Sequence, residues 1–263
     1  MSQTESLIVN RDGGVLTLIN NDPPINRMTL EYMDAVEEVV AQAIEDPDVR
    51  VLVFTAAGDE NFSVGMDLKQ LTSSAGERGG LEAVLDQRLR VLQMIESAPK
   101  PSIVTLFGYC LGGGLELPLA CHFRLAAADG AKIGLPELDL GTVPAWGGTA
   151  RLTRTVGRDH ALDMILRAKK IFGPEALDIG LVQEVHPVEE LKAAADALAH
   201  ELAAMPPRAV AGVLDCVVGH GEASLDDALA AERRAVRACS GTKDQIEGMM
   251  AFMEKRTPVF TGE

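Results

Sequence analysis

Residues 102–152 read SIVTLFGYCLGGGLELPLACHFRLAAADGAKIGLPELDLGTVPAWGGTARL, and this stretch decides the fold. The apolar run SIVTLF predicts a buried strand, which leads into a triple glycine. Glu116 follows the glycines, and Glu137 follows a proline at the end of a short strand-like piece. Both carboxyls can therefore face one cleft, which is the arrangement that acid–base chemistry on a small organic substrate requires.

The composition is that of a globular chain with a sizeable core. Its 263 residues are 47% hydrophobic, which excludes a disordered chain and predicts one large domain, or a domain with a small appendage. The net charge of -15 and the pI of about 4.8 argue against nucleic acid or an anionic membrane as the main partner, because both need a basic face. Any anionic ligand must therefore be held by local donors.

The four cysteines indicate a reducing compartment. Cys110, Cys121, Cys216 and Cys239 show no C-x-x-C spacing, and no signal peptide precedes them. They predict buried reduced thiols rather than disulfides or a zinc site, and hence a cytoplasmic protein. No apolar run approaches the roughly 18 residues of a membrane span, so no membrane partner is expected.

Strand-like runs occupy the first half of the chain. SLIVNRD and GVLTLINN alternate around a DGG turn and predict an opening hairpin. Thr29 can cap a following amphipathic helix, and VRVLVFTA (49–56) is typical of a buried strand. A polar loop comes next, and its continuation SSAGERGG (73–80) is the best candidate for a mobile surface segment.

The second half is mostly helical. Helices are expected at about 81–97, 189–204, 207–218, 223–238 and 243–255. The strands at 49–56 and 102–107 each run into a glycine-bearing loop and then a helical pattern. Such turns leave backbone N–H groups free at a helix start, where a developing negative charge can be stabilised.

Several motifs together resemble the enoyl-CoA hydratase/isomerase family, the crotonases. The most specific are NFSVGMDLKQL (61–71), GYCLGGGLEL (108–117) and LPELDLGTVPAWGGTARL (135–152). DPPIN (22–26), FGPEALDIGLVQEV (172–185) and EGMMAFMEKRTPVF (247–260) are similar to the family too. The resemblance implies an α/β fold, a crotonase-like spiral of repeated ββα units. It also implies a catalytic core at 1–200, a C-terminal helical trimerisation region at 201–263, and a homotrimer or a dimer of trimers.

The resemblance implies an enzyme that adds water across the α,β double bond of an enoyl-CoA thioester, or the reverse dehydration. In such a reaction negative charge collects on the thioester oxygen, and each N–H donor to that oxygen is worth about 10²–10³ in rate. In the family pattern the two donors fall on Met66 and Gly113. Glu116 is expected to activate the water added at Cβ, and Glu137 to deliver the proton to Cα. Two carboxyls in a partly dry cleft resist simultaneous ionisation, so one can stay protonated and act as the acid.

The resemblance also places the rest of the substrate. The backbone of Pro23, Pro24 and Ile25 is expected to line the adenine. Arg27 and Lys69 are the nearest cations that could meet the phosphates, with an ordinary surface charge as the alternative for each. The loop at 61–68 should pass over the pantetheine, and Trp146 should lie near the acyl pocket. Further predicted contacts are Val64, Gly65, Asp67, Leu68 and Gly112. Coenzyme A is part of the substrate, so no separate cofactor and no metal are expected.

Three residues depart from the family pattern. Pro118 falls inside the helix after the glycine loop, where it removes a hydrogen bond and can kink or shorten the helix that carries Glu116. His122 stands where the family commonly has Asp; a lone His beside a strand is more often a satisfied structural residue than a catalyst, and we assign it no role. Trp146 is larger than the usual residue there, and the alternative to a place in the acyl pocket is outward packing at a subunit interface.

Other functions stay open beside hydration. The presence of both glutamates favours hydration over another crotonase reaction such as enoyl-CoA isomerisation. A non-catalytic acyl-CoA-binding homologue is the alternative outside enzymes, because a fold can persist without activity. A serine hydrolase is excluded for want of G-x-S-x-G, and a dinucleotide-binding protein because GYCLGGG does not spell G-x-G-x-x-G.

Overall fold

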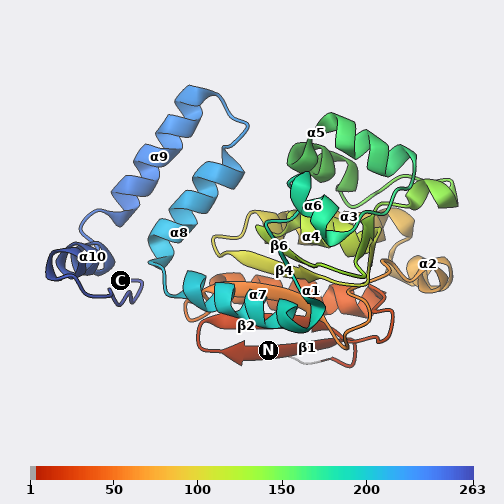
Figure 1. The fold of residues 1–263 in the computed structure, drawn as a ribbon, viewed down its shortest axis with the longest axis horizontal. Helices are drawn as coiled ribbons and strands as arrows, with labels where there is room; N and C mark the ends of the chain where they lie inside the picture. Colours follow the sequence, from red (N-terminus) through yellow and green to blue (C-terminus); the bar gives the residue numbers. More distant parts are fainter. Residues whose placement is uncertain (1–3) are drawn as a thin grey trace.

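A computed structural model describes residues 4–263 (Figure 1). The strands are β1 (Leu7–Asp12), β2 (Val15–Asn20), β3 (Val51–Ala56), β4 (Ser102–Leu106), β5 (Tyr109–Leu111), β6 (Phe123–Ala127), β7 (Lys132–Gly134) and β8 (Glu184–His186). The α-helices are α1 (Leu30–Glu45), α2 (Leu68–Ser74), α3 (Leu81–Glu96), α4 (Gly113–Ala120), α5 (Gly148–Leu166), α6 (Gly173–Asp178), α7 (Val188–Ala203), α8 (Pro207–Leu214), α9 (Leu225–Cys239) and α10 (Lys243–Glu254). Shorter turns are η1 (Ala75–Arg78), η2 (Glu137–Leu140) and the π-helical η3 (Asp215–Gly219).

The main sheet has six strands in the order β1-β2-β3-β4-β6-β8. The predicted hairpin is confirmed as the antiparallel pair β1 and β2, and the remaining pairs are parallel. Every residue of β3 and β4 is buried, which agrees with their continuous apolar sequence and with a parallel sheet that is covered on both faces. α7 packs along five of these strands.

A second, smaller layer of parallel strands supports the site. It contains the two-stranded sheet of β5 and β7, in register from Tyr109 with Lys132 to Leu111 with Gly134. Single bridges extend it on both sides: Ser63 pairs with Cys110, Met28 with Met66, and Ile133 with Ile171.

The chain runs through both layers repeatedly. β4, β5 and α4 form one unit, and β6, β7 and α5 form another. In each unit the first strand joins the main sheet and the second joins the smaller layer. β3 follows the same course, because the segment after it pairs with β5 before α2 begins. This is the spiral of repeated ββα units that the resemblance implies.

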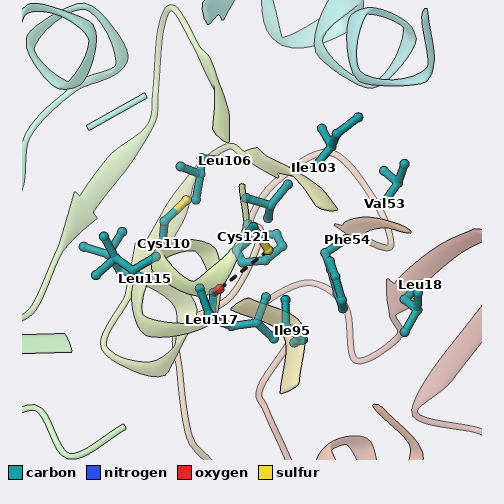
Figure 2. Packing of buried hydrophobic residues seen from close by; sticks show 14 of the residues in the cluster. Leu18, Val53, Phe54, Ile95, Ile103, Leu106, Cys110, Leu115, Leu117 and Cys121 are labelled. Carbon is teal, nitrogen blue, oxygen red and sulfur yellow. Dashed lines mark hydrogen bonds between the residues drawn. The ribbon is translucent and has the colours of Figure 1, made fainter. Parts of the chain in front are cut away.

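One continuous core joins the layers (Figure 2). Leu18, Phe54 and Ile103 come from the main sheet, Ile95 from α3, and Leu115 and Leu117 from α4. Leu117 also accepts a weak hydrogen bond from the thiol of Cys121 at 3.6 Å. α4 is therefore anchored by apolar side chains on both sides of Glu116.

The C-terminal helices lie apart from the sheet. Figure 1 shows α8, α9 and α10 at the opposite end of the molecule from α2, with the C-terminus beside α10. Arg50 ties this region to the core, since its guanidinium donates to the carbonyls of Ala203 and Phe260, both at 3.1 Å. Within residues 4–263 no single helix is long and apolar enough to cross a membrane. The bent combination of α7 with α8 and η3 passes that test only as a pair, by length and composition.

The segment at 73–80, predicted as a mobile surface segment, lies at the surface and is largely helical. Asp67 accepts hydrogen bonds from the amides of Lys69 and Gln70 and so starts α2, which η1 continues to Arg78. Only Gly79 and Gly80, both at positive φ, break the helical path before α3. All four cysteines are free thiols; Cys110 and Cys121 are buried as expected, whereas Cys216 and Cys239 are only half-buried.

Candidate active site

Three neighbouring strands of the smaller layer end at the site. The segment at 62–66, β5 and β7 lie side by side and run parallel. Met66 ends the first, Gly113 follows the second and Glu137 follows the third. Because the carboxyl ends of parallel strands meet at one edge, the topology brings these three residues together.

Glycines allow the two predicted N–H donors to approach each other. Gly65 has a φ of 90°, and a Cβ there would lie 2.7 Å from the carbonyl oxygen of Leu111 and 3.2 Å from the amide nitrogen of Gly113. Gly113 begins α4, so its N–H has no partner within the helix. Among residues 4–263, neither this N–H nor that of Met66 donates a hydrogen bond. Two free donors on adjoining strands are what a developing oxyanion needs.

Glu116 is held in the first turn of a fully buried helix. All eight residues of α4 are buried, and Glu116 itself is 2% exposed. Its Oε1 accepts hydrogen bonds from the amides of Trp146 at 2.7 Å and Gly148 at 2.9 Å. A Cβ at residue 148 would lie 2.8 Å from that oxygen, so only glycine fits.

The environment of Glu116 sets its pKa near neutrality. Burial raises the pKa to about 7, and the nearby carboxyl of Glu137 adds to the rise. The two amide donors and the charge of Arg151 act in the opposite direction. A carboxyl with this pKa can both take and return a proton at physiological pH.

Glu137 has a different environment. It begins η2 and is half-buried, and burial raises the pKa of its carboxyl. Its Oε2 is buried and has no hydrogen-bond partner among residues 4–263. A buried carboxyl oxygen without a donor favours the protonated form, as an acid requires. Gly112 leaves room for this side chain, because a Cβ there would lie 3.2 Å from Glu137 Oε1.

Both glutamates open into one cavity of about 250 Å³. Its wall is made of Val64, Gly65, Met66, Leu68, Leu71, Leu81, Leu85, Gly112, Gly113, Glu116, Pro136, Glu137, Leu140, Thr142, Val143, Ala145 and Trp146. In the described part of the chain, Glu116 and Glu137 are the ionisable residues of this wall. The arrangement can therefore bind an apolar group and exchange protons with it.

Trp146 packs inward against the glycine that begins α4. It is 2% exposed, and a Cβ at Gly113 would lie 2.4 Å from its Cζ3. Arg88 places its guanidinium carbon 5.7 Å from the centre of the indole ring. The carbonyl of Trp146 accepts from Arg151 Nη1 at 2.9 Å, and Arg151 pairs with Glu96 at 2.7 Å. The alternative of outward packing is wrong.

Comparison with known proteins agrees with this geometry. Residues 10–263 match the family model described as enoyl-CoA hydratase/isomerase. A probable enoyl-CoA hydratase of Bacillus subtilis is 39% identical to the chain over 98% of both. The chain belongs to the enoyl-CoA hydratase/isomerase family. It is also 34% identical to the crotonyl-CoA hydratase of Syntrophomonas wolfei, over 97% of this chain and 98% of that one.

Solved structures of the enoyl-CoA hydratase/isomerase family share the fold. The crystal structure of enoyl-CoA hydratase from Bacillus anthracis superposes with a TM-score of 0.93 at 33% identity, over 98% of this chain and 100% of that chain. The predicted crotonase-like fold is thereby confirmed.

The structure brings together part of the site that the sequence predicts for this family member. Met66, Gly113, Glu116 and Glu137 all line the cavity, as do Val64, Gly65, Leu68, Gly112 and Trp146. The other predicted contacts, Pro23, Pro24, Ile25, Arg27 and Asp67, lie outside its wall.

Arg27 and Asp67 are engaged with each other. Arg27 Nη1 lies 3.1 Å from Asp67 Oδ2, and its Nε lies 2.7 Å from Asp22 Oδ2. Asp67 also caps α2. The pair therefore holds the loop at 22–27 to the loop at 61–68. Arg27 already has two carboxylate partners. Lys69 forms no ion pair within residues 4–263.

Asn26 links the loop at 22–27 to the segment that follows β3. It was not singled out from the sequence. It is fully buried with a φ of 49°, and its Nδ2 donates to the carbonyls of Ala57 at 3.0 Å and Asn61 at 2.7 Å. The signal was available, since asparagine in a Pro-Pro-containing turn is a residue that tolerates positive φ. The DPPIN segment is thus positioned by its last residue.

Pro118 and His122 lie in or just after α4 and affect how this part of the chain folds and packs. α4 ends at Ala120, two residues after the proline, and so is short, but Glu116 lies before the proline and keeps its helical place. His122 Nδ1 accepts from the amide of Ser102 at 3.0 Å, and its Nε2 donates to the carbonyl of Glu96 at 3.1 Å. Both ring nitrogens are therefore satisfied by backbone groups of the scaffold.

Proposed function

We propose that this protein is an enoyl-CoA hydratase in which Glu116 and Glu137 act on a thioester held by the amides of Met66 and Gly113. The observation that carries the proposal is the pair of carboxyls with raised pKa that open into one apolar cavity beside two free N–H groups. The names of the relatives, which include a short-chain-enoyl-CoA hydratase and a crotonyl-CoA hydratase, support the same reaction.

The two amides stabilise the charge that hydration creates. As a nucleophile adds at Cβ, electrons move through the conjugated system to the thioester oxygen, and Cα becomes enolate-like. Preorganised donors in a water-poor site stabilise this state without reorganising. The N-terminus of α4 contributes its dipole at the same position.

The carboxyls divide the proton transfers. The ionised form of Glu116, stabilised by two N–H donors on Oε1, takes a proton from the water that adds to Cβ. The protonated form of Glu137, whose Oε2 has no donor, delivers a proton to Cα. The product gains the elements of one water molecule, and the proton balance is restored by exchange between the two carboxyls and solvent.

The cavity takes the acyl end of the substrate. Its volume of about 250 Å³ is below the ~300–1,000 Å³ of pockets that enclose drug-sized ligands, so coenzyme A itself must lie along the surface. The loops at 22–27 and 61–68, joined by Asn26 and Arg27, are the proposed contact for the nucleotide end. Coenzyme A arrives as part of the substrate, and the proposed chemistry uses only side chains and amides of the chain.

The decisive experiment is hydration of crotonyl-CoA by wild type, Glu116→Gln and Glu137→Gln. Each substitution should lower kcat/KM by roughly 10²–10⁴, the usual size of an acid–base contribution. Glu82→Gln, at an exposed position of α3, is the matched control and should be unaffected. Near-wild-type turnover in either active-site variant would refute the assignment. Faster conversion of 3-enoyl-CoA than of 2-enoyl-CoA would make the protein an isomerase, and thioester binding without turnover would make it a binding homologue.

We further propose that the protein assembles as a homotrimer or a dimer of trimers through its C-terminal helices. Apolar side chains on α9 and α10 are strongly exposed in the single chain, among them Val236, Met249, Phe252 and Met253. Large exposed apolar side chains in such number are typical of an interface. Light scattering coupled to size-exclusion chromatography should give three or six copies, and a monomer would contradict the proposal.

A further inference from the structure

Arg88 is a buried cation with few partners. Its exposed fraction is 0%, and among residues 4–263 it forms no ion pair. Its Nη1 meets the side-chain oxygen of its neighbour Gln87, its Nη2 reaches the carbonyl of Thr29 only at 3.5 Å, and its Nε has no acceptor. Burying a charge with so few acceptors is costly, so a compensating interaction is expected.

The carboxylates of Asp34, Glu37 and Glu31 attract the guanidinium through space, and the face of Trp146 adds a direct contact. The guanidinium carbon lies 5.7 Å from the ring centre, within the range of a cation–π contact, and tryptophan is the best aromatic partner for it. Burial lowers the pKa of Arg88 to about 10, so the group stays charged at neutral pH.

The contact lies behind the wall of the cavity. Leu85, one turn before Arg88 on α3, lines the cavity together with Trp146, whereas Arg88 does not. The indole also packs against Gly113, where an added Cβ would meet three ring carbons at 2.4 to 3.0 Å. The ring thus contacts both the first glycine of α4 and the guanidinium.

We propose that Arg88 is a positioning residue that sets substrate specificity: it holds the indole of Trp146 in the acyl pocket and so restricts the enzyme to short enoyl thioesters. The inference rests on the proposed function. If the ring were free to rotate away, the pocket would lengthen toward α3 and admit longer chains.

Arg88→Met tests this directly, because methionine has a similar length and no charge. The ratio of kcat/KM for crotonyl-CoA over trans-2-decenoyl-CoA should fall by about tenfold, within the range expected for a desolvated cation–π contact. Arg88→Lys keeps a cation and should retain most of the wild-type preference for crotonyl-CoA over trans-2-decenoyl-CoA. Arg90→Met is the matched control, since Arg90 lies on the exposed side of the same helix and pairs with Glu37, and it should leave the ratio unchanged.

A second readout does not depend on activity. Trp146 is the sole tryptophan of the chain, so its fluorescence reports only this ring. Arg88→Met should shift the emission to the red and increase quenching by acrylamide, while Arg90→Met should do neither. If Arg88→Met does not fold, Trp146→Phe in the wild-type background weakens the same contact and should lower the same ratio.

Two results would overturn the proposal. The first is an unchanged chain-length ratio and unchanged fluorescence in folded Arg88→Met. The second is a wild-type preference for an enoyl thioester with a distal carboxylate that Arg88→Met abolishes, because the guanidinium would then bind substrate directly. A wild-type protein that hydrates no enoyl thioester would contradict the proposed function instead, and the fluorescence comparison would still decide whether Arg88 holds the ring.

Discussion

Gly113→Ala should nearly abolish hydration, although alanine is a better helix former than glycine. The added Cβ would lie 2.4 Å from Cζ3 and 2.7 Å from Cη2 of Trp146. Carbon atoms in contact are normally about 3.5–4.0 Å apart, so the ring or the start of α4 has to move by at least about 1 Å. The φ of Gly113 lies outside the left-handed region, so the clash, not backbone strain, is the cause.

The loss of activity in Gly113→Ala depends on which group the added Cβ displaces. The indole is confined by Arg88, and its own backbone is held by Glu116 and Arg151, so the start of α4 takes much of the displacement. A misplacement of about 1 Å can cost about 10²-fold in rate. We therefore expect kcat/KM for crotonyl-CoA to fall about 10²-fold, measured by loss of the enoyl-thioester absorbance.

The double variant makes the test specific. Trp146→Ala removes the ring that the added Cβ would meet, so Gly113→Ala/Trp146→Ala should be more active than Gly113→Ala alone. Coupling between contacting residues typically reaches about 0.5–3 kcal/mol, and a value near the upper end is expected. Gly76→Ala, where a Cβ would meet nothing within 4 Å, is the neutral control. Near-wild-type activity of Gly113→Ala, or no recovery in the double variant, would refute the reasoning.

Two further predictions concern Glu116. Its folded pKa of about 7 lies above the ordinary value of 4.5, so the native state binds this proton more tightly, and its contribution to stability is lost as the pH rises from 4.5 to 7. At about 1.4 kcal/mol per pKa unit the loss is about 3 kcal/mol, and Glu116→Gln should escape it. Denaturant unfolding at fixed protein concentration should therefore show the free energy of unfolding of the variant rising relative to that of wild type between pH 4.5 and 7. A difference in unfolding free energy that stays constant over this range would contradict the assigned pKa. Arg151→Met removes a cation that lowers the pKa of Glu116, so the acidic limb of the pH profile of kcat/KM should move to higher pH, and a limb that stays or moves to lower pH would exclude this role.

The residues at strand ends could be predicted from the sequence. Met66, Gly113, Glu116 and Glu137 belong to contiguous motifs in which a strand, a glycine turn and a helix start follow one another, so local chemistry and family pattern agree. Burial of Glu116 was also readable, because leucines flank it on both sides. The structure places all four around the cavity, and their catalytic roles stay predictions.

The wall opposite the glutamates could not be predicted. Leu81 and Leu85 reach the cavity from α3, and Arg88 reaches Trp146, through the packing of α3 near α4, which no local pattern encodes. The helical structure at 73–80 was not predicted, because no local pattern in that segment indicates it and the helix starts ahead of it, at the capping side chain of Asp67. From the sequence, Arg27 was either a phosphate contact or an ordinary surface charge, and only the fold reveals its two carboxylate partners.

The most direct test of the central claim is a structure with an unreactive acyl-CoA, such as butyryl-CoA, bound to the enzyme. The thioester oxygen should accept hydrogen bonds from both Met66 N and Gly113 N, at about 2.7–3.1 Å. Cβ of the acyl chain should face Glu116, and Cα should face Glu137. A thioester oxygen bound away from either amide, or an acyl chain outside the cavity that contains both glutamates, would contradict it.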